Sequence, residues 1–256
     1  MVKHVVTRTL MFALSSAAIL AQAPSFAGTW KLNLAKSQLA GQTVTIEKTP
    51  SGTMHFEGSG FGYEFDLTGK EYPMPDGGTT SWREVNPTTW EATNRVKGKT
   101  VAIFHLTLNS NTITSLVKLP QADGKTVEQT ATFTRLSGET GFLGKWKSTE
   151  MKGAPTTMEI AVDASNGIAV NLPEMQMQCR GKFDGKDYPV STGGTDLNET
   201  LAFEKSGPTS FKMTTKLNGK PFYVDVMTLS PDGKVLTDDG HSIAANEPVK
   251  LVYERN

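Results

Sequence analysis

The sequence has a single cysteine, Cys179, and only four histidines, at positions 4, 55, 105 and 241. One cysteine excludes an internal disulfide framework and any zinc or iron–sulfur site built from several thiolates. We therefore expect Cys179 to be a small buried apolar residue and not a reactive thiol. The histidines are too scattered to give a metal-ligand spacing, so we predict no metal, no other cofactor and no assigned catalytic residue.

An excess of positive charge is also missing, because 26 Lys and Arg balance 26 Asp and Glu. Without a basic excess the chain cannot neutralise a phosphate backbone, which argues against a nucleic-acid partner. Charged residues make up 20% and hydrophobic residues 37%, with 24 Gly and 13 Pro. This composition is typical of a globular, turn-rich protein.

Long apolar runs are limited to the N-terminus, where residues 1–23 are predicted to be a secretory signal peptide. Lys3 and Arg8 precede an apolar stretch from Leu10 to Ala21, and Ala21-Gln22-Ala23 supplies small residues at a cleavage site. The stretch is too short for a stable membrane anchor. We expect no membrane span and a periplasmic or secreted location.

The rest of the chain is a tandem duplication. The matches at an offset of 116 residues are Phe26–Lys31 with Phe142–Lys147, Gly69–Pro73 with Gly185–Pro189, and Gly77–Thr79 with Gly193–Thr195. After a short insertion in the second copy the offset becomes 121, as in Pro87–Trp90 against Pro208–Phe211. We predict two domains, over residues 24–138 and 139–256, each folding by itself.

Each copy has the pattern of an all-β domain. Residues 43–47 alternate apolar and polar side chains and end at a turn. Residues 88–97 and 100–108 flank a Gly-Lys hairpin connection, and residues 126–135 are predicted to form the last strand. Some eight to ten short strands per copy predict an antiparallel barrel or sandwich with little helix.

Two short motifs favour the barrel. Gly28-Thr29-Trp30 opens the first copy and Arg135 lies in its last strand, while Gly144-Lys145-Trp146 and Arg255 do the same in the second. This resembles the lipocalin-like (calycin) superfamily, in which such a Trp packs near an Arg of the last strand. The resemblance implies two tandem barrels in which Trp30, Arg135, Trp146 and Arg255 are structural. The repeats also resemble those of secreted bacterial proteins without an assigned function.

The aromatic distribution places the candidate binding site in the first copy. Trp82 and Trp90 have no Trp counterpart in the second copy, and valines stand opposite His55 and His105. A site needed once would appear as such a difference between copies. We therefore predict that a small, largely apolar molecule binds in the first barrel. The predicted site residues are Trp90, Trp82, His55, Tyr63, Phe104 and His105.

Two other functions stay open. In a cofactor-free isomerase, lyase or hydrolase, His55, Tyr63, Glu64 or His105 would be the acid–base candidates. Filled barrels would instead favour an interaction protein of the cell envelope. The run Asp238-Asp239-Gly240-His241 has the oxygen and nitrogen groups of an ion site, but no Glu follows at the spacing of a calcium loop. We expect this run to be a solvated loop.

Overall fold

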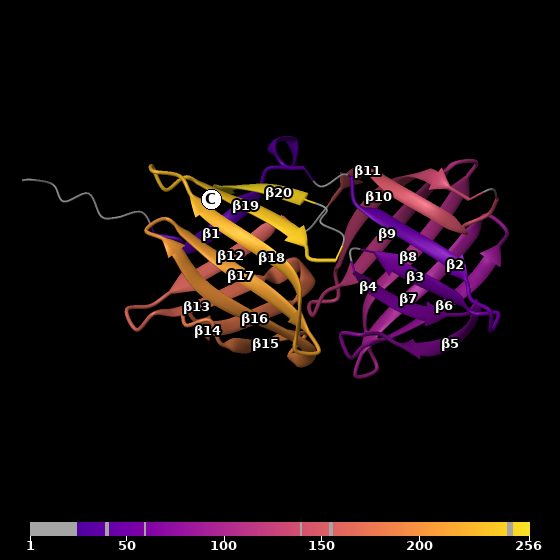
Figure 1. Ribbon diagram of the computed structural model, residues 1–256, viewed down its shortest axis with the longest axis horizontal. Helices are drawn as coiled ribbons and strands as arrows, with labels where there is room; N and C mark the ends of the chain where they lie inside the picture. The colour runs from indigo at the N-terminus through magenta and orange to yellow at the C-terminus, as the bar shows by residue number, and fades with distance from the viewer. Residues whose placement is uncertain (1–24, 39–40, 59, 139, 154–155, 245–247) are drawn as a thin grey trace, which may run out of the picture.

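A computed structural model describes residues 25–38, 41–58, 60–138, 140–153, 156–244 and 248–256. The predicted signal peptide lies outside these residues. The described chain is all-β, with two antiparallel ten-stranded sheets that each curve into a barrel (Figure 1). No helix within the described ranges has the length and apolar character needed to cross a bilayer.

One sheet is a closed barrel, here called the closed barrel, in which the first and last strands pair. Its strands, in spatial order, are β1 (Gly28–Leu32), β12 (Thr157–Val162), β13 (Gly167–Leu172), β14 (Met177–Lys182), β15 (Asp187–Thr192), β16 (Thr195–Gly207), β17 (Ser210–Leu217), β18 (Lys220–Leu229), β19 (Val235–Ser242) and β20 (Pro248–Arg255). A short 3-10 helix, η2 (Pro173–Met175), connects β13 to β14.

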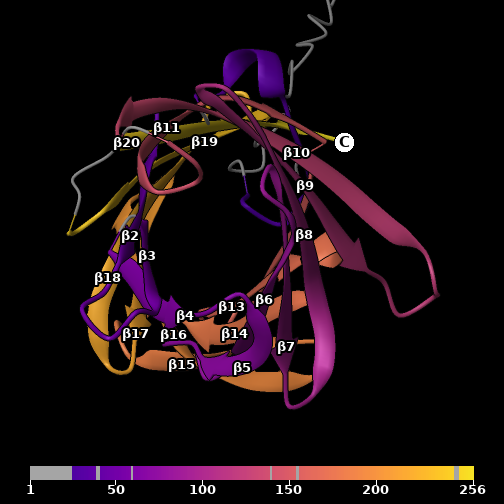
Figure 2. The same cartoon turned by 90° about the vertical axis from the view of Figure 1, so that its right-hand side faces the viewer.

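The other sheet, the open barrel, curves round in the same way, but its edge strands β4 and β5 lie together without a hydrogen-bonded ladder (Figure 2). Its strands, in spatial order, are β4 (Phe61–Phe65), β3 (Met54–Gly58), β2 (Thr43–Lys48), β11 (Gly144–Lys152), β10 (Thr126–Ser137), β9 (Thr112–Pro120), β8 (Lys99–Asn109), β7 (Thr89–Val96), β6 (Thr79–Asn86) and β5 (Thr68–Pro73). The predicted strands at 43–47 and 126–135 and the hairpin near Gly98 are confirmed.

The two sheets exchange their first strands. β1, from the first sequence copy, pairs with β12 and β20 in the closed barrel. β11, from the second copy, pairs with β10 and β2 in the open barrel. The boundary predicted between residues 138 and 139 therefore separates the two sequence copies. It does not separate the two sheets, because each sheet contains one strand from the other copy.

A short connection accounts for the position of β11. Ser137 at the end of β10 is already paired with Lys145 in β11, so the chain between them has only enough length for a hairpin. Short connections join neighbouring antiparallel strands. β11 therefore closes onto the strand that precedes it, and the equivalent place in the closed barrel is left for β1.

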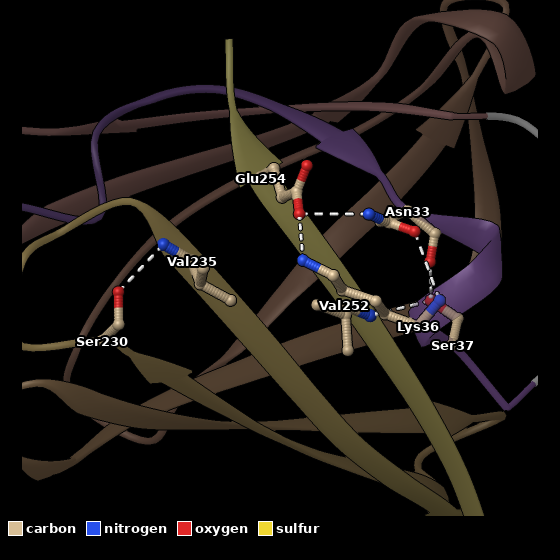
Figure 3. A network of polar contacts seen from close by, with 7 residues as sticks. All are labelled: Asn33, Lys36, Ser37, Ser230, Val235, Val252 and Glu254. Atoms are coloured by element: carbon tan, nitrogen blue, oxygen red, sulfur yellow. Dashed lines mark hydrogen bonds and ion pairs between the residues drawn. The ribbon is translucent and has the colours of Figure 1, made fainter.

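The segment after β1 is held on the closed barrel by polar contacts (Figure 3). Asn33 caps the 3-10 helix η1 (Leu34–Lys36), accepting from the Lys36 backbone N–H at 3.2 Å. Its amide also donates to Glu254 Oε1 at 3.0 Å, and Lys36 Nζ lies 2.7 Å from the same oxygen. Ser37 Oγ accepts from the Val252 backbone N–H at 2.9 Å. These contacts fix the crossover from β1 toward β2 on the outside of β20.

Each barrel has an Arg lying over a fully buried Trp, and the partners come from opposite sequence copies. The Arg255 guanidinium carbon lies 4.2 Å from the Trp30 ring centroid, and that of Arg135 lies 4.1 Å from Trp146. This corrects the expectation that Trp30 would pair with Arg135 within one copy. The physical cause is the strand exchange, since each Trp follows its strand into the other barrel.

The glycine of each Gly-x-Trp motif is required by this packing. Gly28 has a φ of +150°, and a Cβ there would come within 2.5 Å of the Arg255 guanidinium. Gly144 has a φ of +129°, and a Cβ there would collide with the Ser137 carbonyl. A larger residue at either position would displace the Arg or open the hairpin.

We predict that Trp30 is energetically coupled to Arg255 and not to Arg135. In a double-mutant cycle, Trp30→Leu with Arg255→Met should give a coupling of about 1 kcal/mol, because each change removes the same cation–π contact. Trp30→Leu with Arg135→Met should be additive in free energy of unfolding, measured with urea on the full chain. Coupling in the second cycle and additivity in the first would mean that the strands are not exchanged.

Candidate functional site

The direction of each side chain in the open barrel follows from strand alternation. On β8, Ala102, Phe104 and Leu106 point inward, and Ile103 and His105 point outward. The sequence alone left both faces of this strand as possible linings. Packing decides between them, because the inward face meets the apolar residues of neighbouring strands.

The open barrel encloses a cavity of about 270 Å³. Most of its wall is apolar, and six of the lining residues are aromatic: Phe56, Phe61, Tyr63, Trp82, Phe104 and Phe133. Two of them form a stacked pair, with the rings of Phe56 and Tyr63 5.2 Å apart. A concave apolar wall with few polar groups is typical of a site for a small organic molecule.

The tryptophans predicted for the site have different places. Trp82 lines the cavity and stacks on Phe65 at 4.5 Å. Trp90 is buried but does not line the cavity; it stacks on Phe142 at 4.3 Å and meets Trp82 edge to face. Trp90 therefore belongs to the packed core that includes Trp146, and it contacts Trp82 from within this core.

Of the other predicted site residues, Tyr63 and Phe104 line the cavity and the two histidines do not. His55 Nε2 lies 3.5 Å from Glu57 Oε2, and His105 Nδ1 lies 3.0 Å from Glu91 Oε1. Their side chains are 43% and 44% exposed. Both lie on the outer face because each is one residue out of step with the inward positions of its strand.

A few polar atoms lie unpaired in or beside the cavity wall. Within the described residues, Trp82 Nε1 and Asn94 Oδ1 are buried without a hydrogen-bond partner, as is Thr80 Oγ1. Burial raises the pKa of the Tyr63 hydroxyl. Trp82 and Thr80 lie close enough to this hydroxyl to oppose the shift, but neither side chain makes a hydrogen bond of standard geometry. Such unpaired groups are costly unless a ligand or water satisfies them.

Sequence reasoning missed three polar lining residues, Asp76, Ser115 and Asn94, of which Asn94 has a recognisable sequence pattern. It follows Trp90 and Ala92 in the inward series of β7, where a polar residue interrupts apolar positions. That period-two pattern could have identified it, but only once the inward face was known.

The open-barrel cavity lies next to the closed barrel. Phe61, on its wall, meets Phe222 of β18 with 6.4 Å between ring centroids. Asp76, also on the wall, accepts at its backbone carbonyl from the Asn198 N–H of β16 at 2.8 Å. The side of the cavity formed by Phe61 and Asp76 is therefore covered by strands of the other barrel.

Two carboxyl groups meet at this junction. Burial raises the pKa of Asp76, and it raises the pKa of Glu199 on β16 to about 7, with the negative charge of Asp76 adding to the shift. Neither carboxyl has an ion pair with a basic side chain among the described residues. The junction is thus a place where negative charge is poorly solvated.

The described residues contain no group of three or more His, Cys, Asp and Glu placed to hold a metal ion. Cys179 is buried, and burial raises the pKa of its thiol to about 12. Comparison of the chain with protein-family models, curated proteins and solved structures finds no match.

We predict that Glu199→Gln stabilises the protein at pH 8. The folded-state pKa of Glu199, about 7, lies above its ordinary value of 4.5, so the folded state holds a proton that the unfolded state has released. The free energy of unfolding therefore falls as the pH rises through this window. Removing the charge should restore on the order of 2 kcal/mol at pH 8 and little at pH 5.

Urea unfolding at both pH values measures this effect, and Glu84→Gln, at an exposed position on β6, is the matched control. The same gain in the control, or none in Glu199→Gln, would show that Glu199 is solvated in the folded protein.

Proposed function

We propose that the protein binds a small, largely apolar molecule inside the open barrel. The observation that carries this proposal is the cavity itself, with its aromatic wall and unpaired polar atoms. An apolar ligand would bury its surface there at about 25 cal/mol per Å². Trp82 Nε1 can donate one hydrogen bond and Asn94 Oδ1 can accept another. The ligand is therefore a mainly apolar molecule that carries both an acceptor and a donor, such as a hydroxyl group.

The relationship to lipocalin-like (calycin) barrels is part of the same proposal. It is supported by the Gly-x-Trp motifs and by the Arg over each Trp. The N-terminal sequence of residues 1–23 supports export, and hence a periplasmic or secreted binding protein.

The catalytic alternative receives less support. Of its four acid–base candidates, His55, Glu64 and His105 lie on the outer face of the barrel, and Tyr63 alone lines the cavity. General acid–base catalysis needs groups that converge on one substrate. The alternative of an interaction protein with filled barrels is disfavoured by the cavity.

The proposal is tested by filling the cavity. Ser115 on β9 is buried on the cavity wall, and its neighbour Thr114 is exposed on the outer face. The full chain should bind the neutral probe N-phenyl-1-naphthylamine with an increase in probe fluorescence. Ser115→Leu should weaken this binding by about tenfold or more, and Thr114→Leu should leave it unchanged.

Trp82→Phe gives a second variant should Ser115→Leu fold poorly. It removes the indole from the wall, whereas Trp90→Phe changes an equally buried ring that does not line the cavity. Loss of probe affinity in Trp82→Phe alone supports the site. Equal affinity in the wild-type chain, Ser115→Leu and Trp82→Phe would overturn it.

A further inference from the structure

The closed barrel has a cavity of its own, of about 200 Å³, with a different lining. Its apolar wall consists largely of flexible or branched aliphatic side chains, among them Met158, Met177, Val190, Leu201 and Met213. Phe104 and Ser115 line the cavity of the open barrel. At the equivalent positions in the ladder of the closed barrel stand Asp225 and Asp238. Glu199 also lines this second cavity.

Asp225 and Asp238 come from neighbouring strands. In the ladder of β18 and β19, Asp225 is opposite Gly240 and Asp238 is opposite Met227, so the carboxyls are diagonal neighbours on the inner face. Gly240 leaves the space that Asp225 occupies, since a Cβ there would come within 2.7 Å of Asp225 Oδ1. The expectation of a solvated loop at Asp238 is wrong, because strand pairing runs through this segment and points the side chain inward.

Asp238 is 7% exposed, and its Oδ1 atom has no hydrogen-bond partner among the described residues. The carboxyls of Asp225 and Asp238 lie close enough to act on each other's pKa. None of the described residues that line this cavity is Lys, Arg or His. Three carboxyl groups therefore share an apolar chamber to which these wall residues contribute no positive charge.

We propose that the closed-barrel cavity binds a primary ammonium group that carries a short apolar chain. The ammonium supplies three N–H donors, which match the free Asp238 Oδ1 and the oxygens of Asp225. Buried negative charge is strongly disfavoured without a cationic partner, and a ligand cation provides that partner. The methionines and aliphatic side chains provide an adaptable surface for the attached chain.

Binding of the ammonium is linked to proton release. The pair holds a proton in the absence of ligand, because burial raises the pKa of both carboxyls and the negative charge of Asp225 raises that of Asp238 further. The cation replaces this proton, which passes to the buffer. The titratable groups around the pair are Tyr223 on β18, Tyr253 on β20 and Glu199 on β16, and the charge of Asp239 acts on Asp238 from the outer face of β19.

The experiment is calorimetric titration of the full chain with n-pentylammonium and with its neutral counterpart n-pentanol. We expect saturable binding of the amine, at least about tenfold tighter than that of the alcohol. In buffers of different ionisation enthalpy at pH 7, the observed heat should show proton release. No saturable amine binding, or equal affinity for amine and alcohol, would overturn the proposal.

Neighbouring residues on β19 provide the matched variants. Asp238→Asn keeps the side-chain shape and removes the charge, and should weaken amine binding by about tenfold or more. Asp239→Asn removes a charge from the outer face, where Asp239 is 57% exposed and lies 3.7 Å from Lys250, and should change the affinity by less than about twofold. An equal loss in both variants would mean that the amine responds only to net charge.

Asp225→Asn serves as the second variant should Asp238→Asn fold poorly, and the same loss is expected. Ser115→Leu, which fills the open-barrel cavity, should leave amine binding intact. Failure of the amine site is thus distinguishable from failure of the open-barrel site, since each has its own probe and its own blocking variant. Loss of amine binding in Ser115→Leu would place the amine in the wrong barrel and overturn the inference.

Discussion

The architecture depends on an arginine that closes each barrel over a buried tryptophan. Arg255 lies over Trp30 and donates to the carbonyls of Gly233, Ala27 and Ser25, so one side chain joins three segments. Arg135 lies over Trp146 and donates to Asn111, Leu143 and Gly141 in the same way. Each indole donates to the carbonyl four residues before it, at 2.9 Å in both barrels. Since the planar guanidinium can stack and donate at once, the contact links β1 to β20 in the closed barrel and β11 to β10 in the open barrel.

The strand exchange makes the two barrels depend on each other. Each barrel is completed by a strand from the other sequence copy, so neither copy holds its own Arg–Trp contact. Further contacts fix the junction: Gln121 Nε2 donates to the Glu174 carbonyl at 2.7 Å, and Gln176 Nε2 donates to the Pro120 carbonyl at 2.6 Å. The prediction that each copy folds by itself remains open, because an isolated copy would have to place its own first strand where the exchanged strand now lies.

The cavity linings of the two barrels differ, whereas the residues that hold the strands together are alike. The residues shared by both copies are the Gly-x-Trp motifs and the arginines that lie over the tryptophans. The inward positions differ in chemistry, with aromatic rings in the open barrel and paired carboxyls in the closed barrel. Inward side chains are free to differ in this way because the ladder hydrogen bonds use backbone atoms alone. The same fold can therefore present two unlike ligand environments along one chain.

The sequence by itself determined the duplication and the all-β class, because these depend on local alternation, turn residues and repeated motifs. The resemblance of the Gly-x-Trp and Arg motifs to lipocalin-like proteins implied the barrel and the structural role of Trp30, Arg135, Trp146 and Arg255. The sequence also named Trp82, Tyr63 and Phe104, since aromatic residues are more numerous in the first copy than in the second. Tertiary structure alone decided which strand completes which barrel. β1 and β11 carry the same motif, and the short connection between β10 and β11 places β11 in the open barrel and leaves β1 to the closed barrel. Tertiary structure also decided that His55 and His105 face outward and that Asp225 and Asp238 face inward together. Period-two alternation leaves the choice of inward face open until one face of the strand meets a packed core.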